Sequence, residues 1–312
     1  MPPNDRGAAM EQAIIDVGSN SVRMVIYEVD ARRHEVREIY DNKEMAGLAG
    51  FVDAEGALSE QGIQRAVDAV DEQLRRLSHF ACDGVCAFAT AAVRNAVNSA
   101  QVCERVERAC GIRLDVLSGE DEAALSFRGA CRGIPVSDGV MFDLGGGSME
   151  VVRFERGVPV HSASLPVGSL NLYVTHVAAI LPTSEEVRAI REDVAGRLKG
   201  TGWLEGMKSP VLVGVGGAVR AAAKLARRHF RRTGDDGMLA VADLRGLLAA
   251  TAQDGNGLAH EVLAVEPSRV HTVFPGMAAV DALAQAVAAE RIVVARRGVR
   301  EGYLFQRVLG WS

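Results

Sequence analysis

The chain has 312 residues, a length that suits two domains of about 150 residues each. Hydrophobic residues make up 48% and charged residues 24%, the usage of an ordinary globular protein, which excludes a large disordered region. Because the formal net charge is -5, the overall field does not attract nucleic acid or an anionic membrane, and an anionic substrate needs a local basic pocket.

The first half of the chain alternates short apolar runs with amphipathic segments. Apolar residues between 63 and 77 recur at the spacing of one helix face, and Ser59 is a residue type that caps helix N-termini. Gly111 indicates a helix end, and Ser118-Gly119-Glu120-Asp121 indicates a helix start. The elements expected here are strands at 13–15 and 22–29, a helix at 59–77, a strand at 84–89, a helix at 100–110, a strand at 112–117 and a helix at 118–131.

The second half continues this alternation, which predicts an α/β fold. Arg156-Gly157 is typical of a tight hairpin turn, and Thr183-Ser184-Glu185-Glu186 has the pattern of a capping box. The expected elements are strands at 140–142, 149–154 and 158–167, a helix at 183–200, a strand at 211–215 that leads through Gly216-Gly217 into a helix, a strand at 291–295 and a helix at about 300–309.

An internal repeat links the two halves. Asp16-Val17-Gly18-Ser19-Asn20-Ser21 and Asp143-Leu144-Gly145-Gly146-Gly147-Ser148 both follow the pattern Asp-x-Gly-x-x-Ser, between an apolar run and a β-rich run. The offset of 143 − 16 = 127 residues is about one domain, which predicts duplicated lobes, each opening with a hairpin.

Glycine-rich turns of this kind can bind phosphate, because small residues let phosphate oxygens approach the backbone N–H groups. A third such turn, Gly214-Val215-Gly216-Gly217, precedes a helix whose N-terminus also favours an anion. One Asp-x-Gly turn alone is equally well an ordinary hairpin turn, but three in one chain favour a phosphate site. Asp16 and Asp143 repel phosphate, so their useful role would be to hold a divalent cation or its water.

Further carboxylates accompany the second turn. Glu120, Asp121 and Glu122 open a helix, and Glu150 shares one strand face with Ser148. Acidic residues at a helix start are also explained by the helix dipole alone, which each complements by about 0.3–1 kcal/mol. Both interpretations remain open at the level of the residues.

The five cysteines are few and odd in number, and the N-terminal stretch does not resemble a signal peptide, so we expect a cytoplasmic protein. Cys82 and Cys86 have the spacing of half a zinc site, but no second pair follows, and buried thiols are the favoured interpretation. The sequence contains no apolar run of the roughly 18 residues that a membrane span needs.

These motifs together resemble the exopolyphosphatase and guanosine pentaphosphate phosphatase family, Ppx/GppA, within the superfamily of actin, sugar kinases and heat-shock chaperone ATPases. The resemblance spans nearly the whole chain and rests on both Asp-x-Gly-x-x-Ser turns, Thr90 with Arg94, Ser118-Gly119-Glu120-Asp121-Glu122-Ala123, Met149-Glu150, Gly216-Gly217 and Arg297-Gly298-Val299-Arg300-Glu301-Gly302. It implies a two-lobed actin-like ATPase fold, a duplicated ribonuclease H-like α/β fold, with the active-site cleft between the lobes. We expect lobes at 1–125 and 126–312, with the last helix, about 299–310, packing back on the first lobe.

The resemblance also implies a set of site residues. Glu122 matches the family's catalytic glutamate, a general base toward water. Asp143 and Glu150 match its metal-linked acids. Asp16 is a further candidate, because it precedes the first glycine turn as Asp143 precedes the second. The expected cofactor is Mg²⁺ or Mn²⁺. The expected phosphate-binding and substrate-binding residues are Ser19, Asn20, Ser21, Arg94, Gly145, Gly146, Gly147, Ser148, Gly168, Ser169, Gly216 and Gly217.

The implied activity is release of orthophosphate from polyphosphate ends, and the same site fits removal of the 5′-terminal phosphate of guanosine pentaphosphate. Because relatives are often dimers, a homodimer is expected, and neither nucleic acid nor a membrane is expected as a partner. A kinase-like or chaperone-like ATPase and a catalytically silent nucleotide or polyphosphate sensor remain as alternatives within the superfamily.

The chain departs from the family pattern in two places. Met45 stands in the segment 43–51, where relatives commonly carry Arg or Lys, and this removes an expected phosphate contact. The sequence ends at Ser312, where longer relatives append a helical region, so the chain resembles the short form. The first departure bears on chain-length preference and on affinity for long chains rather than on the reaction, and the second predicts a preference for shorter polyphosphates.

Overall fold

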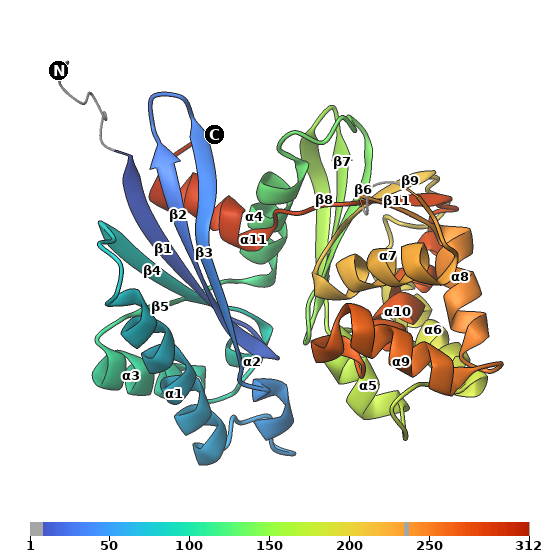
Figure 1. Cartoon of the computed structure of the whole chain (residues 1–312), viewed down its shortest axis with the longest axis horizontal. Coiled ribbons are helices and arrows are strands. Elements are labelled where there is room, and N and C mark those ends of the chain that lie inside the picture. Colours follow the sequence, from blue (N-terminus) through green and yellow to red (C-terminus); the bar gives the residue numbers. More distant parts are fainter. Residues whose placement is uncertain (1–8, 234–236, 312) are drawn as a thin grey trace. The chain divides into compact units, whose positions relative to one another are not determined.

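The computed structural model of the chain describes residues 9–233 and 237–311, and it consists of two compact units that meet in the sequence after Ser118 (Figure 1). We had expected this boundary after residue 125. The helix α4 (Gly119–Cys131) starts at the boundary and belongs as a whole to the second unit, because its apolar face packs on the second sheet.

The first unit is built around a five-stranded mixed sheet in the order β3-β2-β1-β4-β5. β1 pairs with β2 and β2 with β3 in antiparallel fashion, whereas β1, β4 and β5 run parallel. The elements are β1 (Met10–Val17), β2 (Ser21–Asp30), β3 (Glu35–Met45), a 3-10 helix (Leu48–Phe51), α1 (Glu60–Leu77), β4 (Gly84–Ala89), α2 (Ala91–Arg94), α3 (Ser99–Cys110) and β5 (Leu114–Val116).

Local signals place the helices of the first unit. The Ser59 side chain accepts a hydrogen bond from the Gly62 N–H at 3.2 Å, which confirms the expected N-cap of α1. Gly111 ends α3 with φ at 69°, a left-handed conformation that glycine adopts without a steric penalty. Ile63 and Val70 of α1 then pack on the face of the sheet that carries Ile15, and these residues are part of the core of the first unit.

The second unit contains a six-stranded mixed sheet in the order β10-β11-β9-β6-β7-β8. β6, β9 and β11 run parallel, and the remaining pairs are antiparallel. The elements after α4 are β6 (Gly139–Leu144), β7 (Met149–Glu155), β8 (Val158–Leu165), α5 (Ser169–His176), α6 (Ser184–Lys199), β9 (Val211–Val215), α7 (Gly217–His229), β10 (Met238–Ala240), α8 (Val241–Ala250), α9 (Gly255–Val265), a 3-10 helix (Pro267–Arg269), α10 (Val273–Ala286), β11 (Arg291–Val294), α11 (Val299–Tyr303) and a π-helix (Leu304–Val308).

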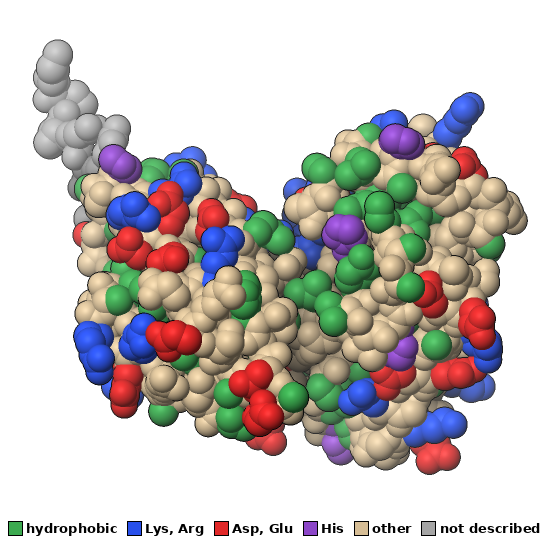
Figure 2. Space-filling model, turned by 90° about the horizontal axis from the view of Figure 1, so that it is seen from below, with side chains coloured by type: hydrophobic (Ala, Val, Ile, Leu, Met, Phe, Trp, Pro, Cys, Tyr) green, Lys and Arg blue, Asp and Glu red, His purple; other side chains and the backbone are tan. Residues whose placement is uncertain are grey.

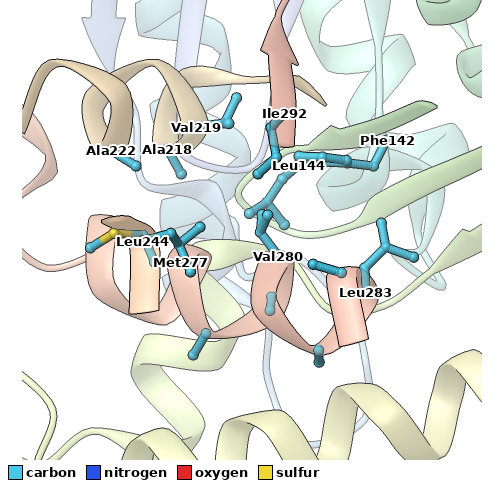
Figure 3. Close-up of a cluster of buried hydrophobic side chains, with 14 of the residues drawn as sticks. Phe142, Leu144, Ala218, Val219, Ala222, Leu244, Met277, Val280, Leu283 and Ile292 are labelled. Atoms are coloured by element: carbon cyan, nitrogen blue, oxygen red, sulfur yellow. The ribbon is translucent and has the colours of Figure 1, made fainter. Parts of the chain in front are cut away.

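The two faces of the second sheet carry different helices because side chains alternate along a strand. Phe142 and Leu144 of β6 point into a core formed with α6, α7, α8 and α10, and Figure 3 shows both beside Val280 and Leu283 of α10. Met141, the neighbour of Phe142, points to the opposite face, where it packs with residues of α4. Asp143 follows the same alternation and therefore lies on the α4 side.

The duplication predicted from the repeat is confirmed in the strand order. The sequence β3-β2-β1-β4-β5 in the first unit corresponds to β8-β7-β6-β9-β11 in the second, with the same parallel and antiparallel pairs. Asp16 pairs with Arg23 across the first hairpin, and Asp143 pairs with Glu150 across the second. The fold is thus a duplicated α/β fold of the expected class.

Several expected elements keep their bounds, and others differ. The capping box of α6 is present, since the Glu186 N–H donates to the Thr183 hydroxyl at 3.2 Å and the Glu186 carboxylate accepts from the Thr183 N–H at 2.7 Å. Arg156 and Gly157 both have positive φ, as a tight hairpin turn requires. The final helix, expected as one α-helix, changes to a π-helix after Tyr303. The elements β3, α2, α5 and those from β10 to α10 were not expected from the sequence.

The surface carries both signs of charge. On the face drawn in Figure 2, acidic and basic side chains are interspersed. Several arginines on helices pair with a carboxylate one helical turn away, as Arg197 does with Asp193 at 2.8 Å. Among the described residues, the helices are too short or too polar to cross a membrane.

Candidate active site

The second glycine turn joins β6 to β7 and brings two acids face to face. Residues 145–148 form the turn, which is closed by a hydrogen bond from the Gly145 N–H to the Ser148 carbonyl at 3.0 Å. Asp143 and Glu150 are directly opposite in the antiparallel register. Cross-strand neighbours have Cβ atoms about 5 Å apart on one face of the sheet, so the two carboxylates share that face.

The N-terminus of α5 fixes the carbonyl side of this turn. The Ser169 N–H donates to the Gly145 carbonyl at 2.9 Å, the Leu170 N–H donates to the Gly146 carbonyl at 2.9 Å, and the Asn171 side chain donates to the Gly147 carbonyl at 3.1 Å. In a trans peptide the N–H points opposite to the C=O, so the amides that follow these carbonyls point away from α5. The turn can therefore offer them to an anion.

Glycine is required at 168 and 216 because other parts of the chain lie against these positions. A Cβ at Gly168 would overlap the peptide between Gly146 and Gly147. A Cβ at Gly216, where φ is 113°, would overlap the Leu144 carbonyl. The expected residues Gly168, Ser169, Gly216 and Gly217 thus surround the turn at the carboxyl ends of β6 and β9, the usual ligand side of an open α/β sheet.

Arg269 is a cation that the sequence analysis did not select. Its guanidinium fills the space that a Cβ at Gly217 would take, so it lies against the N-terminal residue of α7. No local pattern identifies Arg269, because it lies 52 residues from Gly217 (269 − 217 = 52) in a short 3-10 helix.

The first glycine turn, in the first unit, is built in the same way. The Gly18 N–H donates to the Ser21 carbonyl at 3.1 Å, as in the second turn. The carbonyls of Ser19 and Asn20 accept from amides of the segment that follows β3: Ala49 donates to Ser19 at 2.9 Å, and Gly47 donates to Asn20 at 2.9 Å. Asp16, Ser19, Asn20 and Ser21 are thus held at one end of the β1–β2 hairpin.

Arg94 lies at the same edge of the first sheet. The Thr90 N–H donates to the Val17 carbonyl at 3.1 Å, which ties the end of β4 to the end of β1, and Arg94 follows one helical turn later. The Arg94 guanidinium donates to the Leu117 carbonyl at 3.2 Å. Met45 ends β3 in this unit, and its carbonyl accepts from Arg65 of α1 at 2.7 Å.

Three acids group on the α4 side of the second sheet. Glu122, in the first turn of α4, is 8% exposed, and Glu150 is 1% exposed. Burial raises the pKa of Glu150 well above its ordinary value, and the charges of Glu122 and Asp143 raise it further. Hydrogen bonds from Ser164 and Ser148 lower the pKa of Glu150 but do not outweigh these effects.

Two serine hydroxyls, both absent from the sequence-based site, bind these acids. The Ser126 hydroxyl, on α4, donates to Asp143 Oδ2. The Ser164 hydroxyl, on β8, donates to Glu150 Oε1 at 2.8 Å, and Ser164 is the residue opposite Glu150 in the β7–β8 register. Ser126 follows Glu122 by four residues, a spacing on one helix face that could have identified it.

The helix α11 holds α4 in place through contacts between backbones. A Cβ at Gly302 would overlap the Leu125 carbonyl of α4, and a Cβ at Gly129 would overlap the Gly298 carbonyl. The Glu301 carboxylate accepts from the Gly298 N–H at 2.7 Å and closes the first turn of α11. The distance between α11 and α4, which carries Glu122, therefore depends on the segment Arg297-Gly298-Val299-Arg300-Glu301-Gly302.

The acid cluster fits a divalent cation that also binds substrate. In the described part of the chain, no group of three or more His, Cys, Asp or Glu side chains has the geometry of a site formed by protein alone. Mg²⁺ in phosphoryl-transfer sites is usually bound by one or two carboxylates together with water and phosphate oxygens. Burial first, and then the charges of Glu122 and Asp143, raise the pKa of Glu150, and such a cation would offset this concentration of negative charge.

The structure thus divides the expected site residues between the two units. The second unit brings together Glu122, Asp143, Glu150, the turn at 145–148, Gly168, Ser169, Gly216 and Gly217. The first unit carries Asp16, Ser19, Asn20, Ser21 and Arg94. Cys82 and Cys86 are half-buried free thiols in the first unit, and burial raises the pKa of each.

Fold and site together define the class of this protein: a duplicated α/β protein with acids grouped beside a glycine turn suited to phosphate. Within that class, the chain belongs to the Ppx/GppA phosphatase family, which matches residues 25–310. The family resemblance deduced from the motifs is therefore confirmed.

Individual relatives agree with this assignment. Exopolyphosphatase 1 of Mycobacterium bovis is 27% identical over 310 residues, which cover 96% of this chain and 88% of that protein. An uncharacterized protein of Streptomyces coelicolor is 35% identical over 195 residues, which cover 61% of this chain and 57% of that protein.

Solved structures share the fold. The crystal structure of an Aquifex aeolicus member of the Ppx/GppA family has a TM-score of 0.78 at 24% identity, with 97% of this chain and 99% of that chain covered. The structure of an exopolyphosphatase from Cytophaga hutchinsonii has a TM-score of 0.83 at 21% identity, with the same coverage.

Proposed function

We propose that the chain is an exopolyphosphatase that releases orthophosphate from the ends of inorganic polyphosphate by metal-assisted hydrolysis. The observation that supports this most is the grouping of Glu122, Asp143 and Glu150 on one face of the second sheet, beside a turn whose amides point away from α5. Phosphoryl transfer requires an oriented water and donors for the non-bridging oxygens, and this region contains candidates for both.

In this reaction, water attacks the terminal phosphorus, and the bond from that phosphorus to the bridging oxygen breaks. Glu122 takes a proton from the attacking water as the general base, and the bridging oxygen leaves with the shortened polyphosphate. Asp143 and Glu150 are the residues of the second unit that would hold Mg²⁺ or Mn²⁺, and Asp16 is the corresponding candidate of the first unit. When bound, the cation would neutralise charge on the phosphate oxygens.

The remaining residues bind the substrate. In the second unit, the amides of the turn at 145–148 are the proposed donors to the non-bridging oxygens, where negative charge develops during the reaction. In the first unit, the proposed donor is the Arg94 guanidinium. Gly168 and Gly216 are needed because a side chain at either position would displace the turn. The other proposed contacts are Ser19, Asn20, Ser21, Ser169 and Gly217.

A phosphate-release assay on polyphosphates of defined length, with Mg²⁺ and with a chelator, tests the proposal. We expect orthophosphate release that depends on Mg²⁺ and a product ladder in which chains shorten one phosphate at a time. Absence of orthophosphate release from every chain length in the presence of Mg²⁺ or Mn²⁺ would contradict it.

Guanosine pentaphosphate is the second candidate substrate, because the family includes both activities in its name and the same acids and turns suit both terminal phosphates. Comparing release from polyphosphate and from guanosine pentaphosphate at equal concentration discriminates them. A kinase-like ATPase would instead consume ATP only with an acceptor, and a sensor would bind polyphosphate tightly without releasing phosphate.

A further inference from the structure

We infer that Ser126 is a positioning residue of this site: its hydroxyl holds the Asp143 carboxylate in the orientation in which Asp143 would bind the divalent cation. This inference rests on the proposed function, because it gives Asp143 the role of a cation ligand. It adds a residue that lies outside the acid and glycine motifs.

The position of Ser126 on α4 carries the inference. Ser126 is 0% exposed, and it lies one helical turn after Glu122, so the two side chains point to the same side of the helix. Asp143 ends up on that side because the alternation along β6 turns it toward α4. One face of α4 thus supplies both the proposed base and a hydrogen bond to the acid opposite it.

The surroundings make this hydrogen bond specific to one carboxylate oxygen. Ser126 donates to Asp143 Oδ2. A Cβ at Gly298 would lie 3.7 Å from Asp143 Oδ2 and 3.7 Å from the Ser126 hydroxyl oxygen, so the backbone at the start of α11 lies next to the pair.

Residues that hydrogen-bond to metal ligands fix ligand orientation, and their loss typically costs 10- to 100-fold in metal affinity or activity. A role in packing alone would instead lower thermal stability without changing cation affinity. The two roles of Ser126 can therefore be separated by measuring cation binding directly.

The test measures Mn²⁺ binding to the full chain by electron paramagnetic resonance in the presence of orthophosphate, which supplies the phosphate oxygens of the proposed site, alongside phosphate release and the melting temperature. Ser126→Ala should fold, because alanine favours a helix interior. We expect it to weaken Mn²⁺ binding about 10-fold or more and to raise the Mg²⁺ concentration needed for half-maximal phosphate release by a similar factor. Ser126→Thr retains the hydroxyl, so its Mn²⁺ affinity should stay within about threefold of that of the unchanged protein. This change is smaller than the loss of affinity expected without the hydrogen bond.

Ser137→Ala is the matched control. Ser137 also donates to an aspartate, Asp138, but this pair is exposed and precedes β6, at the opposite end of that strand from Asp143. We expect Ser137→Ala to bind Mn²⁺ as the unchanged protein does.

The outcomes separate this inference from the proposed function. Equal Mn²⁺ affinity in Ser126→Ala and Ser137→Ala would overturn the inference, and so would equal losses in Ser126→Ala and Ser126→Thr, since side-chain volume would then be responsible. Absence of Mn²⁺ binding in the unchanged protein would overturn it as well. If Mn²⁺ binding depends on the Ser126 hydroxyl while polyphosphate is not cleaved, the positioning role stands and the proposed substrate is wrong.

Discussion

Glu122 is the residue on which the proposed chemistry depends most. It opens α4 on the side that faces Asp143 and Glu150, and it is nearly buried. We expect Glu122→Gln to lower kcat for phosphate release by about 100- to 10,000-fold, because glutamine cannot accept the proton of the attacking water. The fold should be preserved, since the two side chains have nearly the same shape.

Asp121→Asn is the control, because Asp121 is exposed and pairs with Arg307 at 2.8 Å. Activity of Glu122→Gln near that of the control would disprove the base assignment.

The buried carboxyl of Glu150 predicts a pH dependence of stability when no cation is bound. Burial first, and then the charges of Glu122 and Asp143, raise the pKa of Glu150 above its ordinary value of 4.5. The folded chain therefore binds the Glu150 proton more tightly than the unfolded chain does. The contribution of the protonated Glu150 carboxyl to stability is fully present below pH 4.5 and is lost as the pH rises through the raised pKa.

In the presence of a chelator, Glu150→Gln should therefore melt at a higher temperature than the unchanged protein at pH 8, and the difference should shrink as the pH falls toward 4.5. Melting curves measured by circular dichroism at several pH values check this expectation. An unchanged protein that is as stable as the variant at pH 8 would show that the Glu150 carboxylate is not under strain.

At the scale of elements, the capping box of α6 makes a local prediction. Thr183→Ala removes the acceptor of the Glu186 N–H and should lower the free energy of unfolding by about 1 kcal/mol. Hydrogen bonds from the N–H of Thr183 and then of Ala178 lower the pKa of Glu186, so its contribution is present above pH 4.5 and is lost as the pH falls through the lowered pKa. Urea unfolding of Thr183→Ala measures this loss in the free energy of unfolding, and Ser184→Ala is the control. Equal free energies of unfolding in the two variants would refute a stabilising role of the Thr183 hydroxyl.

The contact between α4 and α11 predicts a larger effect that couples stability to activity. Gly302→Ala would place a Cβ on the Leu125 carbonyl, so α11 and α4 must move apart, at a cost of roughly 1–3 kcal/mol. Because α4 carries Glu122 and Ser126, phosphate release should fall as well. Gly196→Ala is the matched control: Gly196 is inside α6 with open space around it, and alanine there should stabilise the helix by about 0.5–1 kcal/mol. Unchanged melting of Gly302→Ala would contradict the close packing.

At the scale of the whole molecule, each unit has its own sheet and its own core. Ile63 on α1 and Ile190 on α6 are both fully buried, one in each core. Ile63→Ala and Ile190→Ala should each cost about 2–5 kcal/mol. In native-state hydrogen exchange, each variant should lose protection mainly in its own unit, 9–118 or 119–311. Equal losses in both units for both variants would show that the chain unfolds as a single cooperative body.

Elements with strong local signals were predicted well from the sequence. The N-cap at Ser59, the capping box at Thr183 and the turn at Arg156-Gly157 all depend on hydrogen bonds or backbone angles within a few residues. The helix α10 was missed for a physical reason: it is buried almost all around, so its apolar residues show no one-sided spacing. The strand β3 was missed because none of its residues is buried and many are charged, which hides the alternation of a strand.

By itself, the sequence determined the class of fold, the duplication and the positions of the glycine turns, because the repeat and its turns are visible in the residue pattern. Only the tertiary structure decided that Ser126 binds Asp143, that Arg269 lies against Gly217 and that α11 packs on the backbone of α4. These contacts join residues far apart in the chain, and they depend on how helices pack on a sheet, which no local spacing encodes.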